Sequence, residues 1–382
     1  MITRVEATNF RCLKSVSQAL RPFQVLVGPN SSGKSAFLDV INFIGDLVTV
    51  GLKEAVGKRT DNFHDLVWGR EGTAFSLGVE AQVPPGVTEA GNCPTVRYEV
   101  RVGLDPSVSA IKVQSEDLTL HDDAGERQSM QRGLAAAAFT EDTSSDRHIF
   151  PVMADRSGLW NLPDDRTRFH VGAWFRELLQ EGTQLVELDK ASLRAATPPG
   201  RGKPRIYDGR DLAQTAFTVS ESSPDGLTAW IKHIKTALPD VETVKTVLRP
   251  EDRYRYLMIR YRNGIEVPSW ALSDGTLRLL ALTLLAYVAN FGGVYLIEEP
   301  EIGVHPTAIE TIVQSLSSVY YGQVLLTSHS PILLSLPAPR DLLCFQRTDE
   351  GTEIIPGDQH PMLQDWRSGV NISDLFAAGV LG

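Results

Sequence analysis

A P-loop pattern, G-x-x-x-x-G-K-[ST], is matched by the residues Gly28-Pro29-Asn30-Ser31-Ser32-Gly33-Lys34-Ser35. The apolar run from Phe23 to Val27 predicts a short buried strand before it, and the apolar spacing from Ala36 to Ile41 predicts a helix after it. A strand, a glycine-rich turn and a helix start together form a cradle of backbone N–H groups that suits phosphate. A glycine turn that fits the pattern by chance is the alternative, and the flanking strand and helix argue against it. The motif therefore predicts a site for a nucleoside triphosphate.

Each part of this motif has an expected role in holding the nucleotide. Lys34 is expected to reach the terminal phosphates as a point charge, and the Ser35 hydroxyl is expected to hold Mg²⁺. The residues expected to bind the nucleotide here are Asn30, Ser31, Ser32, Gly33, Lys34, Ser35 and Ala36.

A second apolar run ends in acidic residues. Val294 to Ile297 suits a buried parallel strand, and Glu298-Glu299-Pro300-Glu301 follows it. Carboxylates at the carboxyl end of such a strand lie beside the mouth of a P-loop. Glu298 would hold Mg²⁺, and Glu299 would orient the attacking water as general base. An acidic strand end is also common on protein surfaces, so the pattern is not specific by itself.

Two further segments offer contacts for the γ-phosphate. In Leu272-Ser273-Asp274-Gly275-Thr276 we expect Ser273 to be an N-cap, and a helix that begins there would direct free N–H groups at an anion. Val324 to Ser328 reads as another buried strand, and His329 at its end would place an imidazole near the phosphate. Taken singly, an ordinary helix cap and a structural histidine are the simpler interpretations. Their order in the chain is what argues for a function.

P-loop, Leu-Ser-x-Gly helix, acidic strand end and strand-end histidine follow one another here as they do in ATP-binding-cassette (ABC) ATPases. The chain resembles the soluble RecF-like and structural-maintenance-of-chromosomes-like (SMC-like) branch of these AAA family ATPases. Within that branch it is most similar to standalone ATPases related to the overcoming-lysogenization-defect (OLD) nucleases. The resemblance covers roughly residues 1–105 and 250–382, and it is carried by Thr8 to Cys12, Gly28 to Ser35, Leu272 to Arg278, Leu296 to Pro306 and Thr327 to Pro331.

This resemblance implies an α/β fold of the ABC-type P-loop class, with an N-terminal antiparallel β-subdomain and a helical insertion. It implies ATP and Mg²⁺ as ligands, with Glu299 as the catalytic glutamate and His329 as the switch histidine. Glu298 stands where many members have Asp, and it still offers a carboxylate to the metal. Ser273 and Gly275 match the signature that touches ATP bound to the opposite subunit of a dimer. Arg11 matches an arginine near the nucleotide, while the glutamine of the Q-loop has no clear match.

The chain divides into three expected parts: residues 1–105 and 246–382 form the two halves of the ATPase head, and residues 106–245 form a helical or loop insertion. Alternating apolar residues from Phe75 to Val83 and from Val96 to Leu104 predict half-buried antiparallel strands in the first part. Helical patches at Val171–Gln180 and Leu227–Leu238 suggest a compact lid or interaction module in the insertion. No heptad repeat is sustained, which argues against a long coiled-coil arm.

Composition bounds the environment and the partners. The chain has 382 residues, a formal charge of −10 and a hydrophobic share of 42%. No apolar run approaches the roughly 20 residues that span a bilayer, so we expect no association with a membrane. The cysteines show no metal-binding or C-x-x-C spacing, which suits a reducing cytoplasm. The negative charge argues against nucleic-acid binding over the whole surface. A local basic cluster, Arg201-Gly202-Lys203-Pro204-Arg205 with Arg210, leaves DNA open as a partner, and a solvated loop is the simpler interpretation.

The expected function is an ATP-hydrolysing switch that dimerises around two nucleotides and controls a separate effector such as a nuclease. Bacterial anti-phage defence and DNA maintenance are the expected settings. No second acidic constellation follows Trp366, where the related nucleases continue into their nuclease domain, so the effector is expected on another polypeptide. The alternatives are the nucleotide-binding subunit of a membrane transporter and an ATP-binding scaffold that does not turn over. The insertion and the Leu-Ser-Asp-Gly-Thr signature argue against the transporter.

Overall fold

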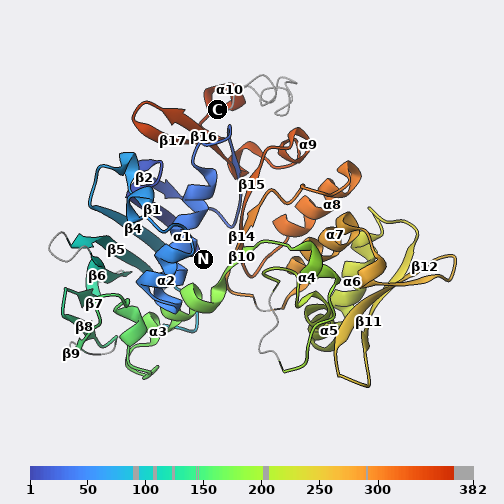
Figure 1. Cartoon of the computed structure of the whole chain (residues 1–382), viewed down its shortest axis with the longest axis horizontal. Helices are drawn as coiled ribbons and strands as arrows, with labels where there is room; N and C mark the ends of the chain where they lie inside the picture. Colours follow the sequence, from blue (N-terminus) through green and yellow to red (C-terminus); the bar gives the residue numbers. More distant parts are fainter. Residues whose placement is uncertain are drawn as a thin grey trace.

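The computed structural model describes residues 1–88, 94–105, 110–122, 125–142, 144, 146–200, 206–289 and 291–364. Two large sheets face each other with one long helix between them, and a helical region with a small third sheet lies to one side (Figure 1).

The six-stranded sheet carries the P-loop. Its order is β10-β14-β15-β3-β16-β17, and its strands are parallel except for β17 at the edge. The bounds are β3 (Phe23–Val27), β10 (Thr183–Val186), β14 (Val294–Glu298), β15 (Gln323–Ser328), β16 (Leu342–Thr348) and β17 (Gly351–Pro356). The strands predicted before the P-loop, before the acidic residues and before the histidine are confirmed as β3, β14 and β15. Because these three are parallel neighbours, their carboxyl ends meet at one edge.

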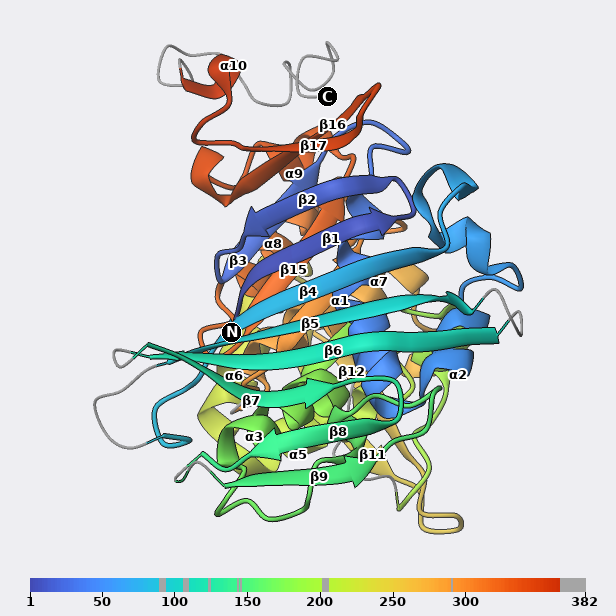
Figure 2. The ribbon, with the colours of Figure 1, turned by 90° about the vertical axis from the view of Figure 1, so that its left-hand side faces the viewer.

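The second sheet is antiparallel, with the order β2-β1-β4-β5-β6-β7-β8-β9 (Figure 2). Its strands are β1 (Ile2–Phe10), β2 (Leu13–Ala19), β4 (Ala74–Gln82), β5 (Thr95–Asp105), β6 (Ala110–Asp122), β7 (Gly125–Arg132), β8 (Ala136–Thr140) and β9 (Arg147–Pro151). The two predicted alternating strands are confirmed as β4 and β5.

The expected boundary of the sheet at residue 105 is wrong, because β6 to β9 continue it to Pro151. The sequence conceals these strands in two ways. Register shifts at Arg101/Val102 and Leu118/Thr119 break the alternation of apolar residues. In addition, Glu116 is fully buried and accepts hydrogen bonds from Tyr98 Oη (2.8 Å) and Gly158 N (2.7 Å), so a core position carries a charge.

Helix α1 (Lys34–Thr49) lies between the two sheets and is buried along nearly its whole length. Its contacts include β1 and β4 on one side and β10 and β15 on the other. Leu26 and Leu296 point toward α1, whereas Val25 and Ile297 point to the opposite face, which packs against α7 (Asp274–Leu284) and α8 (Pro306–Ser317). The remaining side of α1 carries a polar stripe that lines a cavity, made of Ser35, Asp39, Asn42, Asp46 and Thr49, so the apolar residues are those that the sheets cover. The P-loop helix is therefore held by both sheets.

The helical part of the insertion begins at α3 (His170–Glu177). The two predicted helical patches are confirmed: α3 continues in a π-helical turn to Gly182, and the second patch is α6 (Pro224–Ile234). After α6, strands β12 and β13 pair antiparallel on either side of Asn263-Gly264. The remaining elements are α2 (Leu52–Gly57), α4 (Lys190–Arg194), α5 (Leu212–Ser222), α9 (Pro331–Leu334), α10 (Pro361–Gln364), β11 (Val241–Leu248), β12 (Arg255–Tyr261) and β13 (Glu266–Pro268).

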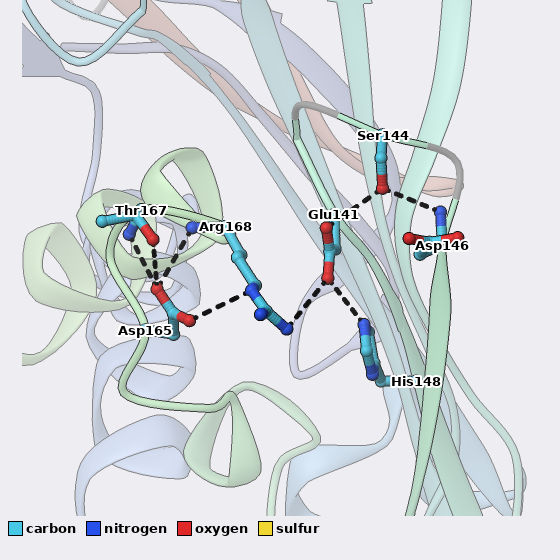
Figure 3. A network of polar contacts seen from close by, with 7 residues as sticks. All are labelled: Glu141, Ser144, Asp146, His148, Asp165, Thr167 and Arg168. Carbon is cyan, nitrogen blue, oxygen red and sulfur yellow. Dashed lines mark hydrogen bonds and ion pairs between the residues drawn. The ribbon is translucent and has the colours of Figure 1, made fainter.

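A polar network fastens the outer edge of the antiparallel sheet to the segment before α3 (Figure 3). Glu141 Oε1 lies 2.8 Å from His148 Nε2 and 3.4 Å from Arg168 Nη1, and Arg168 Nε lies 3.3 Å from Asp165 Oδ2. The hydrogen bond with His148 lowers the pKa of Glu141. These acids have partners within the chain, so this cluster holds the fold together.

Two sequence expectations fall partly or wholly outside the described residues: the cluster at 201–205 and the segment after residue 364. Arg210, which was grouped with that cluster, pairs with Asp208 through Nη2 and Oδ2 at 3.1 Å. Within the described ranges, no helix is both long and apolar enough to cross a membrane.

Candidate nucleotide site

A cavity of about 990 Å³ opens where β3, β14 and β15 end. It brings together most of the residues that the sequence analysis assigned to the nucleotide, and the most distant of these, Arg11 and His329, are more than 300 positions apart. From the predicted set it is lined by Arg11, Asn30, Ser31, Gly33, Lys34, Ser35, Ala36, Glu299 and His329. Glu298 lines a neighbouring cavity of about 680 Å³ together with Ser35.

The P-loop backbone adopts conformations that favour glycine. Gly33 has φ of 106°, and a Cβ atom there would lie 2.6 Å from Thr352 Oγ1 on β17. Thr352 Oγ1 in turn donates to Ser32 O at 3.0 Å, so β17 closes over the loop. Among the residues that the structure describes, none forms a hydrogen bond with the buried Ser32 Oγ. An orphaned hydroxyl at the start of α1, beside free N–H groups, is what an anion site requires.

Lys34 is buried and its ammonium is held in place by the loop itself. Nζ donates to Gly28 O and to Pro29 O, both at 2.8 Å. Burial lowers the pKa of Lys34 to about 8, and the charges of Glu299 and Glu298 partly oppose this shift. Bound phosphate would supply the negative charge that burial leaves uncompensated.

Ser35 and Glu298 meet at the edge of the sheet. Ser35 Oγ donates to Glu298 Oε2 at 2.9 Å. The pKa of Glu298 is raised, first by burial and then by the charges of Glu187, Glu299 and Asp39. Hydroxyl and carboxylate oxygens that crowd together are the ligands that Mg²⁺ prefers, and the ion would neutralise phosphate charge here. In the described part of the chain no group of three or more His, Cys, Asp or Glu is arranged to hold a metal, so phosphate oxygens would complete the coordination.

Glu299 and His329 face each other across the ends of β14 and β15. Glu299 has φ of 45°, an uncommon conformation for a residue other than glycine, and its N–H donates to Thr327 O at 3.1 Å. Strain of this kind is concentrated at functional sites. His329 Nε2 lies 3.4 Å from Glu299 Oε1. Burial, together with the charge of Lys34, lowers the pKa of His329, so the imidazole is neutral at pH 7.

Glu301 is a site residue whose role the sequence did not reveal. Its Oε1 accepts hydrogen bonds from Ser328 Oγ (2.6 Å), His329 N (3.1 Å) and Ser330 N (3.1 Å). This carboxylate fixes the turn that carries the histidine. Glu301 is the last acid of the Glu-Glu-Pro-Glu segment, so the acidic pattern included it. The sequence alone did not show which residues its carboxylate would bind.

Glu187 is a second unpredicted neighbour of the metal position. It follows β10, whose Val186 pairs with Ile297 of β14, so Glu187 stands level with Glu298. Its charge helps to raise the pKa of Glu298. Nothing in the local pattern Thr-Gln-Leu-Val marks this strand as a neighbour of β14.

The outer wall of the cavity comes from the segment after α2, which the sequence left without a role. Arg59 is buried and pairs through Nη2 with Asp39 (2.6 Å) and through Nη1 with Asp46 (2.8 Å). Arg11 Nη2 also reaches Asp39, at 3.1 Å. The half-buried Thr60, Asp65 and Trp68 and the exposed Gly69 and Arg70 continue this wall. The same cavity is also lined by Arg347, Thr348, Asp349, Gly351 and Thr352.

The signature residues lie elsewhere. None of the described residues from Leu272 to Thr276 lines the cavity. The expected N-cap is confirmed, because Ser273 Oγ accepts from Thr276 N at 3.1 Å, and Ser273 is exposed. Gly275 packs so closely on the loop after β14 that a Cβ atom would lie 2.8 Å from Gly303 O. The N-terminus of α7, capped by Ser273, is therefore open to solvent.

Comparison with known proteins agrees with this geometry. Residues 23–335 match the family described as AAA domain, putative AbiEii toxin, Type IV TA system. The chain belongs to this AAA-domain family. A curated relative is the Retron Vc95 probable ATPase of Vibrio cholerae serotype O1 biovar El Tor, 27% identical over 157 residues. These residues are 38% of this chain and only 29% of that protein.

The fold is also similar to solved SMC heads. One is an SmcHead bound to the C-winged helix domain of ScpA, with a TM-score of 0.60, 12% identity, and coverage of 93% of this chain and 97% of that one. Another is an Smc head domain with an extended coiled coil bound to the C-terminal domain of ScpA derived from Pyrococcus furiosus, with a TM-score of 0.51, 12% identity, and coverage of 96% and 99%. The ABC-type, SMC-like fold expected for this AAA-domain protein is confirmed. The relation to OLD nucleases stays a prediction.

Proposed function

We propose that this AAA-domain protein is an ATP-hydrolysing switch that works as a homodimer and controls a separate effector. The observation that carries the proposal is the separation of two half-sites on one chain. Phosphate and base positions line one cavity, and Ser35 joins it to the neighbouring cavity that Glu298 lines, while the capped start of α7 faces solvent outside the nucleotide cavity. A second copy placed head-to-tail would bring each α7 to the other copy's nucleotide, and two-fold symmetry would make both sites equivalent.

Within each site the residues divide the work. Lys34 and the start of α1 would bind the β- and γ-phosphates, and Ser35 with Glu298 would hold Mg²⁺. Glu299 would take the proton of the attacking water, because its strained backbone directs the carboxylate into the cavity. His329, neutral and braced by Glu301, would donate to or accept from the γ-phosphate region.

ATP would join the two subunits. Its γ-phosphate would accept hydrogen bonds from Ser273 and from the N–H groups at the start of α7, and hydrolysis would remove that acceptor. The bound and hydrolysed states would then differ in how tightly the dimer is closed, and an effector could read that difference.

The effector is proposed to be a separate protein such as a nuclease, in bacterial anti-phage defence or DNA maintenance in the cytoplasm. The names of the matched family and of the retron relative support a defence setting. The SMC heads were solved with a domain of ScpA bound, which supports a partner on another chain. DNA is proposed as a further candidate partner.

Complementation of two inactive variants tests the composite site. Lys34→Ala removes the phosphate-binding charge, and Ser273→Arg blocks the start of α7. Each is expected to be inactive alone, whereas an equimolar mixture should regain about a quarter of wild-type hydrolysis, because half of the dimers then have one intact site. Ser223→Arg is the matched control, since Ser223 caps α6 in the same way. An inactive mixture that contains heterodimers would refute the composite site, and so would a Ser273→Arg monomer with full activity.

A further inference from the structure

Two cations from the insertion are attached to the signature turn. On α4, Lys190 Nζ lies 2.7 Å from Asp274 Oδ2, and Arg194 Nη2 lies 2.6 Å from Asp274 Oδ1. Arg194 Nη2 also donates to Leu272 O at 2.8 Å. The insertion thus reaches the residues on both sides of Ser273, although it is separated from them by about 80 positions of sequence.

The charge of Asp274 makes these contacts significant for nucleotide binding. The hydrogen bond from Lys190, with the charges of Arg194 and Arg278, lowers the pKa of Asp274, so the carboxylate is ionised at neutral pH. A negative charge directly after Ser273 would repel a γ-phosphate there. Lys190 and Arg194 together outweigh the single negative charge of Asp274, so the charge around the turn is net positive.

The two cations differ in how firmly they are held. The Arg194 side chain is 30% exposed and bridges two groups of the turn, which makes it a structural clamp. The Lys190 side chain is 66% exposed and is paired with Asp274 through the end of a long, flexible stem. An exposed ion pair of this kind contributes little to stability, so Lys190 can leave Asp274 easily when a stronger anion arrives.

We propose that Lys190 contacts the γ-phosphate of the nucleotide held by the partner subunit's P-loop. The inference rests on the dimer of the proposed function and adds a residue from the insertion to its composite site. Lys190 reaches Asp274, the neighbour of Ser273, so any anion seated on the start of α7 lies within the sweep of the same side chain. The ammonium then stabilises charge that develops on the phosphate during hydrolysis, which Arg194 cannot do while it clamps the turn.

Loss of the Lys190 charge should affect turnover more than binding, because the nucleotide is held mainly by its own P-loop. Lys190→Ala is expected to lower the hydrolysis rate about 100-fold, the size of one lost contact to a developing charge, with the Kd for ATP changed by less than about threefold. Lys190→Arg should restore most of the rate. Lys232→Ala, which removes an exposed lysine from α6, is the matched control and should leave both quantities unchanged.

A purely structural role for Lys190 predicts a different pattern. If the lysine only balances Asp274, then Asp274→Asn should abolish the effect of Lys190→Ala. If Lys190 contacts phosphate, the loss of rate should persist in the Asp274→Asn background. Disappearance of the effect in the double variant would overturn the proposal.

Mixed dimers decide whether Lys190 acts on the partner's nucleotide. Three equimolar mixtures are needed: Lys34→Ala with Ser273→Arg, Lys34→Ala with Lys190→Ala, and wild type with the Lys34→Ala/Lys190→Ala double variant. Action across the interface predicts about a quarter of wild-type activity in each of them. Action on the chain's own nucleotide predicts none in the second mixture and about a half in the third. That outcome, or wild-type activity of Lys190→Ala alone, overturns the Lys190 proposal. An inactive first mixture refutes the dimer itself.

Discussion

Raising the pH through about 8 is expected to weaken ATP binding, because the buried ammonium of Lys34 loses its proton in that range. An exposed lysine has a pKa of about 10.4 and stays charged below pH 9, so it would make the affinity for ATP independent of pH in that range. Burial lowers the pKa of Lys34 to about 8, and the two backbone carbonyls that accept its hydrogen bonds carry only partial charge. The triphosphate would raise this pKa again. ATP therefore binds the protonated form preferentially, and affinity is fully present below pH 8 and lost above it.

The magnitude follows from the shift. A group with a pKa of about 8 is roughly 90% protonated at pH 7 and roughly 10% protonated at pH 9. The Kd for ATP should then rise about tenfold between these values, which corresponds to about 1.4 kcal/mol. His329 adds no charge change over this interval, because burial and the charge of Lys34 lower the pKa of its imidazole from the ordinary value. The γ-phosphate, with a pKa near 6, changes little.

Calorimetric titration with a non-hydrolysable ATP analogue measures this effect directly. Repeating it in two buffers with different ionisation enthalpies should show proton uptake near pH 8.5. Lys34→Arg is the control, since a guanidinium stays charged throughout and should give a flat profile. A wild-type Kd that is constant within twofold from pH 7 to pH 9, or an equal slope in Lys34→Arg, would refute the reasoning.

The remaining predictions concern two carboxylates. Glu299→Gln should keep ATP binding but lower phosphate release by about 10²- to 10⁴-fold, because the general base is lost; wild-type turnover would assign the base to another residue. Glu187→Gln should raise the Mg²⁺ concentration needed for half-maximal hydrolysis by about tenfold, because a negative charge beside Glu298 is removed. Exposed Glu71→Gln is its control, and an unchanged Mg²⁺ titration would exclude Glu187 from the metal site.

The sequence predicted those parts of the site in which chemistry requires a residue type at a fixed spacing. Gly33 and Lys34 are such positions, because the loop must approach phosphate closely, and the acids after β14 must end a buried strand. Other features depend on pairing between distant segments. Glu187 is placed by the register of β10 against β14, and Thr352 reaches the P-loop because β17 crosses over it. The pattern of residues within one segment shows neither the register of β10 against β14 nor the position of β17 over the P-loop.

The antiparallel sheet shows the same limit. β4 and β5 were predictable because their apolar residues alternate without interruption. In β6 a bulge shifts the register against β5, and the buried Glu116 occupies a position where an apolar residue is expected. Glu116 is satisfied by Tyr98, Gly158 and Ser157, none of which is adjacent in sequence. Because these partners are distant in sequence, the sequence alone suggests that Glu116 is a surface residue.

The segment from Glu187 to Arg194 leaves β10 beside Glu298 and arrives at the start of α7 within a few residues. Arg278 Nη1 of α7 also donates to Leu188 O in this segment, at 3.1 Å. Coupling between two binding events is reciprocal: if nucleotide changes the affinity of a site for its ligand, that ligand changes the affinity for nucleotide by the same factor. If nucleotide binding shifts this segment, a protein that binds the insertion near α4 would alter how tightly ATP and its metal are held while touching neither the P-loop nor the signature. Control from outside would then need no access to the nucleotide.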